Sequence, residues 1–185
     1  MNSNWFKIVM KMTNVRYGKN LLLKGMPIIF NQKGASLTIG DNCKIFSSFL
    51  SNLVGLYQKT IVVTRIPGAE IKIGNNVGMS GVTVYARKSI TIGDHTQIGG
   101  NTKIIDNDFH PIDAEDRLRD DKERIVAKTI VIGNNCFIGC NSIILKGTVL
   151  GDNCVVGAGA VVSGKFNDNC VIAGNPAKVI RTLKV

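Results

Sequence analysis

The stretch IGNNCFIGCNSIILKGTVLGDNCVVGAGAV, residues 132–161, divides into five units of six residues. A sixth unit, VSGKFN, follows at 162–167. Every unit begins with Ile, Leu or Val, and glycine follows that residue in four of the six. The fifth place of the first five units is small in every case: Cys136, Ser142, Thr148, Cys154 and Ala160. A fixed short period of this kind indicates a repeat architecture.

A six-residue unit fits a short extended face followed by a tight turn, and three such faces make one triangular coil of about 18 residues. The large aliphatic residue fills the interior, and the small residue leaves room beside it at the corner. Stacked coils bury a continuous core and pair each strand with the strands above and below it. We therefore predict an all-β fold, a parallel β-helix. The same phase is visible upstream: Ile39, Ile45, Ile73, Met79, Ile92, Ile98 and Ile104.

The composition supports one domain of this kind. A chain of 185 residues with 20 glycines and 6% aromatic residues suits a β-rich solenoid better than a helical bundle. No run approaches the ~20 apolar residues that span a bilayer. The first 20 residues lack the long apolar segment of a secretory signal. We therefore expect a cytoplasmic location.

The net charge of +10 is unevenly distributed, because no acidic residue precedes Asp41. A basic surface favours anionic partners, such as phospholipid headgroups or phosphorylated small molecules. Nucleic acid is not expected, since no recognition motif accompanies the charge. We predict that residues 1–33 form a basic segment that packs on the end of the β-helix. Five apolar residues in it fit a short amphipathic helix, for which membrane contact is the alternative role: Trp5, Phe6, Ile8, Val9 and Met12.

The five cysteines do not suggest chemistry. Cys43, Cys136 and Cys154 all occupy the small inward position of a unit. An odd number of cysteines without a secretory signal argues against a disulfide framework. The spacing of Cys136 and Cys140 is not that of a Cys-x-x-Cys metal or redox motif. We interpret these cysteines as core filler and expect no metal site.

The stretch IIDNDFHPIDAEDRLRDD, residues 104–121, interrupts the repeat. The unit after Ile104 should begin at position 110, but the next regular unit begins at Ile132, so about 22 residues loop out of the coil. Long structured insertions tend to carry function. The predicted loop, residues 106–131, has His110 at its root. The other histidine, His95, lies in the turn IGDHTQ and is expected to be an exposed surface residue.

The repeat [Ile/Leu/Val]-Gly-x-x-[small]-x resembles that of the hexapeptide-repeat acyltransferases. The resemblance implies a left-handed β-helix over residues 34–180, with an extruded loop, short terminal helical segments and a tail at 181–185. The segment 75–113, NNVGMSGVTVYARKSITIGDHTQIGGNTKIIDNDFHPID, resembles O-acetyltransferases of bacterial capsule and O-antigen polysaccharides and of maltose and galactosides. Within this family the chain is identified as an acetyltransferase that uses acetyl-coenzyme A and no metal, and that forms a homotrimer.

The resemblance also implies the role of His110. In the family, a histidine at the base of such a loop is the general base, and DFHPID is similar to that motif. An imidazole with a pKa near neutrality suits this task, because a sugar hydroxyl must lose a proton as it attacks a thioester. An acid or a carbonyl would hold the correct tautomer. The candidates are Asp106, Asp108 and Asp113, and the sequence does not choose among them.

Binding residues follow from the same resemblance. For the saccharide acceptor they are Ser80, Tyr85 and Phe137, where Phe137 stands in place of a frequent tryptophan. The coenzyme is expected in a groove between subunits, with backbone contacts and phosphate-binding cations at the later coils. The residues that match are Cys140, Ala158, Ser163, Gly164, Lys165, Lys178 and Arg181.

Other functions remain open at this point. An N-acetyltransferase acting on a nucleotide-linked amino sugar would need the same base. A serine acetyltransferase is disfavoured, because the large helical N-terminal region of that group is absent. A zinc-dependent carbonic anhydrase on the same fold needs three histidines, and this chain has two. A non-catalytic scaffold would leave the polar loop and the basic C-terminal segment without a purpose.

Overall fold

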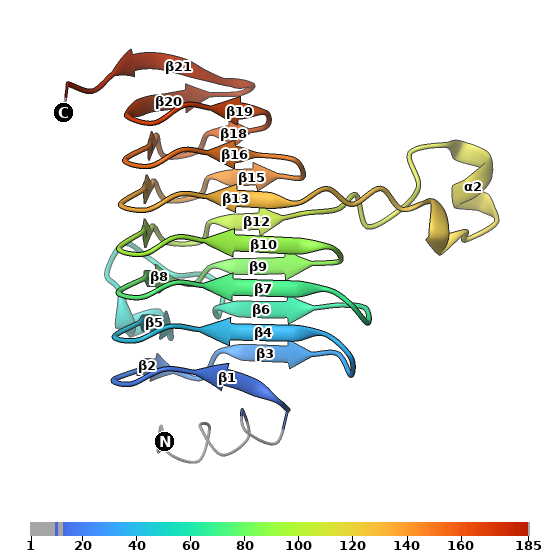
Figure 1. The fold of residues 1–185 in the computed structure, drawn as a ribbon, viewed down its shortest axis with the longest axis horizontal. Coiled ribbons are helices and arrows are strands. Elements are labelled where there is room, and N and C mark those ends of the chain that lie inside the picture. The colour runs from blue at the N-terminus through green and yellow to red at the C-terminus, as the bar shows by residue number, and fades with distance from the viewer. Residues whose placement is uncertain (1–9, 11–12, 185) are drawn as a thin grey trace.

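The fold is a left-handed parallel β-helix, described by a computed structural model for residue 10 and residues 13–184. Coils of strand stack into a column with the first strand at one end and the last at the other (Figure 1). In the described part of the chain, three sheets of seven, eight and six strands form the three faces of the column. We call these faces A, B and C, and the turns between them the AB, BC and CA corners. The prediction of an all-β helix is confirmed.

Each face collects every third strand of the chain, and face B also includes β21, which follows β20 directly. Face A consists of β1 (Val15–Tyr17), β4 (Ser36–Ile39), β7 (Glu70–Ile73), β10 (Ser89–Ile92), β13 (Ile130–Ile132), β16 (Val149–Leu150) and β19 (Lys165–Phe166). Face B consists of β2 (Leu22–Gly25), β5 (Lys44–Ser47), β8 (Gly78–Ser80), β11 (Gln97–Ile98), β14 (Phe137–Ile138), β17 (Val155–Val156), β20 (Cys170–Gly174) and β21 (Ala177–Thr182). Face C consists of β3 (Ile28–Asn31), β6 (Ile61–Thr64), β9 (Thr83–Ala86), β12 (Lys103–Ile105), β15 (Ile143–Leu145) and β18 (Val161–Val162).

The register follows the six-residue phase of the sequence. Ile132 lies beside Leu150 on face A, and Ile138 beside Val156 on face B, each pair 18 positions apart. These aliphatic side chains are at most 1% exposed and belong to one continuous core. Because one large residue from each face points inward in every coil, the column is filled by a stack of Ile, Leu and Val.

The small inward residues do more than leave room. The hydroxyl of Thr96 donates to the carbonyl of Gly133 at 2.9 Å, and the thiol of Cys136 donates to that of Gly151 at 3.2 Å. Each of these bonds reaches a turn of the next coil. The fifth place of the unit therefore favours a residue that is both small and a donor, which explains why Cys, Ser and Thr recur there.

The AB corner is built from a ladder of acidic and amide side chains. Asn75 accepts from the backbone N–H of Asp41 at 2.9 Å, Asp94 accepts from that of Asn75 at 2.7 Å, and the pattern continues upward. The residue after each rung adopts a left-handed conformation, as in Asn76 and Asn135 with φ of 57° and 55°. Asn tolerates this conformation better than most residues, which explains the recurring Asn at this place.

The predicted domain boundaries need correction at three places. The β-helix begins at Val15, not at residue 34, because β1, β2 and β3 pair with β4, β5 and β6. At the other end β21 crosses the predicted boundary at 180 and pairs antiparallel with β20. The loop spans residues 106–129, since β13 already begins at Ile130. The first coils escaped the sequence analysis because their strands recur at intervals other than 18; Leu23 lies beside Ile45.

A second insertion was missed for the same reason. Residues 48–60, which we call the apolar loop, leave the column at the BC corner between β5 and β6 and include a 3₁₀ turn, Phe49–Ser51 (Figure 1). Leu56 is buried against the wall, at 2% exposure. The other large apolar side chains of this loop are exposed: Phe49, Leu50, Leu53, Val54 and Tyr57.

The predicted N-terminal amphipathic helix lies outside the described residues, except for Met10. The Met10 side chain is 1% exposed and belongs to the core. Between Thr13 and Lys184, the structure contains no helix that is long and apolar enough to cross a bilayer.

The first prediction concerns Cys136. Burial raises the pKa of its thiol to about 11, so it is a neutral donor at pH 7 and a poor nucleophile. Replacing Cys136 by alanine removes the bond to Gly151 and should lower the free energy of unfolding by about 1 kcal/mol, measured by denaturant titration. Cys136→Ser should recover part of that loss. Turnover per folded molecule should stay unchanged, and its disappearance in a folded variant would show that the thiol takes part in the reaction.

Candidate active site

The interruption at residue 106 begins as a rigid antiparallel stem. The N–H of Lys128 donates to the carbonyl of Asp106 at 2.8 Å, and the N–H of Asp108 donates to that of Val126 at 3.2 Å. An isolated bridge between Asn107 and Ala127 lies between these two bonds. The loop thus leaves the CA corner as two paired arms, and it projects far from the column (Figure 1). The stem fixes the residues that follow it.

A sharp turn at Phe109 places His110. Phe109 has φ of 61°, an unusual value for an aromatic residue, and its N–H donates to Asn107 Oδ1 at 2.9 Å. Its ring packs on Tyr85 of β9, with ring centroids 4.9 Å apart and planes tilted by 59°. The N–H of His110 then donates to the carbonyl of Asp108 at 2.7 Å. Local strain of this kind often marks a functional position.

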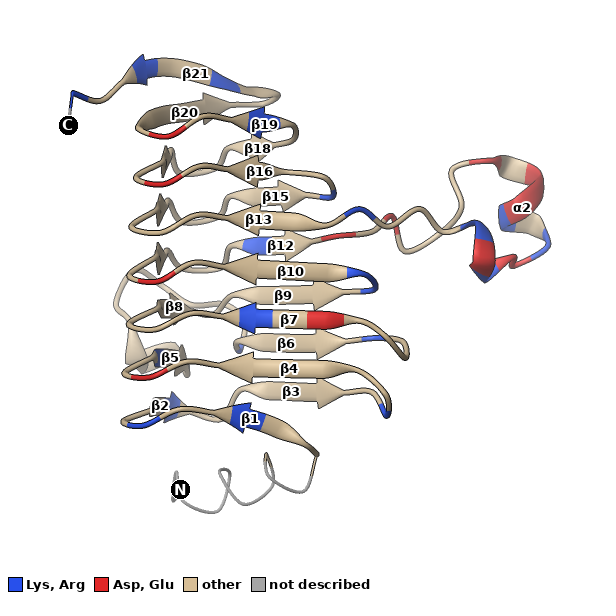
Figure 2. Cartoon of the chain, in the orientation of Figure 1, with Lys and Arg blue, Asp and Glu red and all other residues tan. Residues whose placement is uncertain are grey.

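His110 opens into a small pocket of about 170 Å³ at the loop root. Two aromatic residues, Tyr85 and Phe109, form one side of it. Its charged residues are mainly cationic, in keeping with the Lys and Arg residues that lie along the CA corner (Figure 2). The full lining is Arg65, Tyr85, Arg87, Asn107, Phe109, His110, Asp120, Lys122 and Ile125. The predicted pair of His110 and Tyr85 therefore lies in one pocket.

Asp106, one of the three acids predicted to orient His110, binds the turn before β10. Its carboxylate is fully buried and accepts the backbone N–H groups of Arg87, Lys88 and Ser89, at 2.8, 2.7 and 2.9 Å. The side chain of Asn107 donates to it as well, at 3.1 Å. These four donors occupy the carboxylate and fix the turn before β10. None of these four donors belongs to His110.

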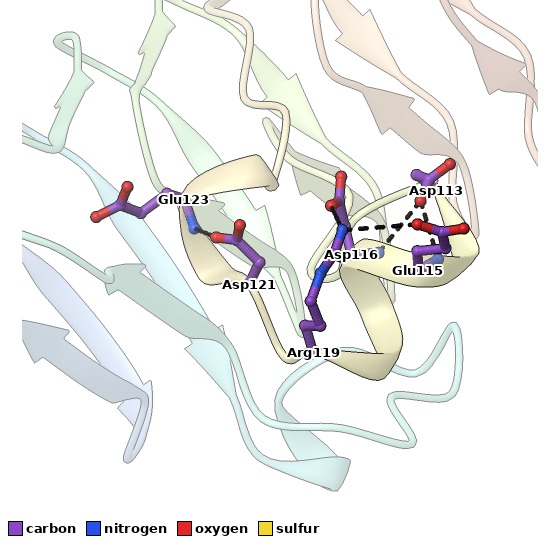
Figure 3. Close-up of polar contacts among 6 residues, drawn as sticks. All are labelled: Asp113, Glu115, Asp116, Arg119, Asp121 and Glu123. Atoms are coloured by element: carbon purple, nitrogen blue, oxygen red, sulfur yellow. Dashed lines mark hydrogen bonds and ion pairs between the residues drawn. The ribbon is translucent and has the colours of Figure 1, made fainter.

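Asp113 is also engaged elsewhere. It caps the short helix α2 (Ala114–Leu118) and accepts the N–H groups of Glu115 and Asp116, at 2.9 and 3.2 Å (Figure 3). Arg119, the residue that follows α2, pairs with Asp116. Because α2 buries none of its residues, these contacts hold its fold. The acids of the outer loop stabilise the loop itself.

Asp108 is, of the three predicted acids, the nearest to His110 in sequence. Its Oδ1 accepts a short bond from the ammonium of Lys146, while Oδ2 is buried and has no hydrogen-bond partner within the described residues. Its backbone carbonyl already holds the N–H of His110. Of the three predicted acids, Asp108 therefore keeps a free acceptor beside the loop root.

The other predicted residues lie at several places on the protomer. Ser80 accepts from Asn52 at 3.1 Å and lines a groove on face B with Phe137, away from the pocket of His110. Cys140 and Ala158 lie one above the other at the BC corner, close to Gly139. Ser163 and Gly164 lie at the CA corner before β19, which begins at Lys165, and Lys178 and Arg181 belong to β21. A single protomer does not bring the predicted coenzyme residues together.

The sequence analysis missed the cations of the pocket. Arg65 and Arg87 follow β6 and β9, and their strands are neighbours on face C. The two arginines are 22 positions apart, so neither the six-residue nor the 18-residue period relates them. Only the pairing of β6 with β9 identifies them as neighbours. The turn at Phe109 likewise carried no recognisable signal.

Sequence comparison agrees with this architecture. The family described as the hexapeptide repeat of succinyl-transferase matches residues 129–163. A galactoside O-acetyltransferase of Escherichia coli is 37% identical over 117 residues, which are 63% of this chain and 56% of that protein. Over these residues the chain is similar to the hexapeptide-repeat acyltransferases.

Another relative is a putative acetyltransferase of Dictyostelium discoideum, 47% identical over 96 residues. The match covers 52% of this chain and 48% of that protein. The alignments thus span about half the length of the curated relatives.

Solved structures extend the likeness to nearly the whole chain. A galactoside acetyltransferase in complex with coenzyme A has a TM-score of 0.61 and 26% identity, covering 96% of this chain and 69% of the other. The N-acyltransferase AntD from Bacillus cereus, in complex with dTDP and coenzyme A, has a TM-score of 0.72 at 21% identity, covering 96% and 89%. The second likeness is one of fold. Within the residues placed by the structure, no three His, Cys, Asp or Glu side chains gather to hold a metal ion.

The second prediction separates structural from catalytic acids. Asp106→Ala leaves three backbone donors without their acceptor and should lower the free energy of unfolding by about 3 kcal/mol. Asp113→Ala removes only an exposed helix cap and should cost about 1 kcal/mol or less. Thermal unfolding of both variants measures the difference. Equal losses would contradict the assignment of Asp106 as the fixing group of the turn.

Proposed function

We propose that this hexapeptide-repeat protein is an acetyltransferase that moves the acetyl group of acetyl-coenzyme A to a hydroxyl of a saccharide, with His110 as the general base. The observation that carries the proposal is the position of His110. It follows a strained turn, it is anchored by a paired stem, and it opens into a pocket beside Tyr85. A β-helix does not need this arrangement for stability.

The exposed imidazole suits direct transfer. The hydroxyl oxygen attacks the thioester carbonyl while His110 takes its proton, and a tetrahedral intermediate forms. When the carbon–sulfur bond breaks, the imidazolium returns the proton to the departing thiolate, so an acetyl ester and free coenzyme A result. We assign the orienting role to Asp108, through its carbonyl or its free Oδ2, because Asp106 and Asp113 have their own donors.

Coenzyme A as donor is supported by the galactoside acetyltransferase that was solved with it. The predicted donor residues occupy two corners and the last strand of the protomer. A groove between two copies would bring the BC corner of one chain near the CA corner of another. The proposal therefore includes a homotrimer, in which Cys140 and Ala158 line one wall and Ser163, Gly164, Lys165, Lys178 and Arg181 supply further contacts.

The exposed apolar loop supports assembly. Five large apolar side chains on one short loop are unusual for a surface that faces water only. In a closed ring of identical chains, the same loop of each copy would be covered by a neighbour.

Transfer to an amine is the second candidate. AntD, which shares the fold, is an N-acyltransferase whose structure contains dTDP. An amino group of a nucleotide-linked sugar would need the same base, so the two acceptors differ in the attacking atom and not in the site. Modification of bacterial surface polysaccharide at the cytoplasmic side of the membrane is the wider role that we propose, on the resemblance of residues 75–113.

The third prediction tests the base. His110→Ala should lower kcat by about 10²–10⁴, the usual contribution of general base catalysis. Coenzyme A binding, measured by calorimetric titration, and the melting temperature should stay near the wild-type values, since the side chain is exposed. Turnover is followed by thiol release from acetyl-coenzyme A with a panel of saccharides.

The matched control is His95→Asn. His95 is the other histidine of the chain, it is exposed at the AB corner, and Asn stands at the corresponding place in neighbouring coils. This variant should keep full activity. A His110→Ala enzyme with near-native kcat on a hydroxyl acceptor would refute the proposed base.

The fourth prediction concerns assembly. Light scattering at micromolar concentration should give the mass of three chains. Leu53 is 92% exposed, so Leu53→Asp should leave the protomer folded and shift the mass toward that of one chain. Leu118→Asp, at an 88% exposed apolar position in α2, should leave the mass unchanged. A monomeric wild-type protein would remove the shared groove.

A further inference from the structure

We infer that the acceptor of this enzyme carries a phosphate group next to the sugar, and that Arg65 and Arg87 bind this phosphate in the pocket of His110. The inference rests on the proposed transferase function and specifies its substrate class. It comes from the positive charge of the pocket, because a neutral sugar does not need two arginines to bind it.

The two arginines are neighbours without acidic partners. The N–H of Arg65 donates to the carbonyl of Ala86 at 2.8 Å, which places Arg65 beside Arg87 on adjacent coils, one strand spacing apart. Like charges at neighbouring positions of paired strands destabilise a sheet. Within residues 13–184, neither guanidinium forms an ion pair. An anion bound between Arg65 and Arg87 would attract both guanidinium groups and offset the repulsion between them.

Other charges around the pocket do not cancel the arginines. Lys122 also lines it and pairs with Asp120 at 3.2 Å, so these two charges offset each other. Asp106 does not line the pocket, and its carboxylate binds the backbone N–H groups of the turn at 87–89. The pocket therefore has a surplus of about two positive charges, which matches a dianionic phosphate better than a single carboxylate.

Part of the site is already held in place. Arg87 Nη2 donates to the carbonyl of Lys122 at 3.2 Å, so the arginine spans from the wall to the loop. Tyr85 and Phe109 provide apolar ring surface on the same pocket, against which the face of a sugar can pack. A phosphate on the two guanidinium groups and a sugar on the rings would bring a sugar hydroxyl toward His110. The cations thus orient the acceptor for the base.

The test uses matched acceptors with the full chain. Each sugar is supplied as its neutral methyl glycoside, as its 1-phosphate, as a nucleoside diphosphate sugar and as a polyprenyl diphosphate derivative in detergent. At least one phosphate-bearing form should exceed the methyl glycoside in kcat/KM by about 10–100-fold, the value of one or two charge-assisted hydrogen bonds. The best of the three forms identifies the source of the phosphate.

The variants are Arg65→Gln, Arg65→Lys and the control Lys88→Gln. Arg65→Gln should lower kcat/KM for the phosphorylated acceptor by about 10–100-fold and that for the methyl glycoside by less than about 3-fold. Arg65→Lys should restore part of the loss. Lys88 is an exposed cation of the neighbouring turn that does not line the pocket, so its variant should behave like the wild type.

A readout without turnover completes the experiment. With coenzyme A saturating the donor site, calorimetric titration of inorganic pyrophosphate should give binding that Arg65→Gln weakens by about 10-fold or more. Equal kcat/KM for neutral and phosphorylated sugars would overturn the inference, as would a preference for uronic acids over phosphates. Weaker coenzyme A binding by Arg65→Gln would assign the arginines to the donor and overturn it too. If coenzyme A itself does not bind the wild type, the proposed function fails instead.

Discussion

The close stacking of turns at the AB corner is the constraint on which the rest of the structure depends. A Cβ atom at Gly93 would lie 2.5 Å from the backbone of Gly133, and one at Gly133 would lie 2.6 Å from that of Gly151. Side chains larger than hydrogen therefore do not fit at these places. The glycines allow each turn to pack directly on the next. The Asp and Asn side chains of the ladder accept hydrogen bonds from backbone N–H groups of the neighbouring turn. This contact sets the coil spacing, and with it the register of all three faces.

A wall built in this way leaves little freedom for chemistry. Each coil has nearly the same backbone as the next, and its inward residues are committed to the core. The chain can insert extra residues only at corners where the turns do not pack directly on one another. In the described residues, the two long insertions leave from the BC and CA corners, at 48–60 and 106–129, while the AB corner keeps its short turns. The corner that fixes the register is thus separate from the corners that carry the candidate site and the apolar surface.

The sequence predicted those features that the period controls. It identified the core aliphatic residues, the inward cysteines and the break in which His110 lies, because each is a regular place in the repeat or a departure from it. It could not predict contacts between coils of irregular length. Arg65 meets Arg87 across 22 positions, and Asp106 meets the turn at 87–89 across fewer than 20. The role of an aspartate in a polar loop depends on its hydrogen-bond partners, which the sequence does not show. Only the structure therefore distinguishes Asp106, which binds backbone N–H groups, from Asp108.

The hydrogen-bond and ion-pair partners of the loop acids show what these residues do. Asp113 and Asp121 cap short helices, and Asp116 pairs with Arg119, so these carboxylates have their partners within the loop itself (Figure 3). Outside the loop, acidic residues lie mainly at the AB corner, whereas Lys and Arg residues lie along the CA corner from which the loop departs (Figure 2). A loop rich in acid can therefore leave a pocket that is positive at its root. The loop holds His110 in a pocket whose charged residues are mainly cationic. The positive charge of this pocket supports the proposed acceptor with an anionic group over a neutral sugar.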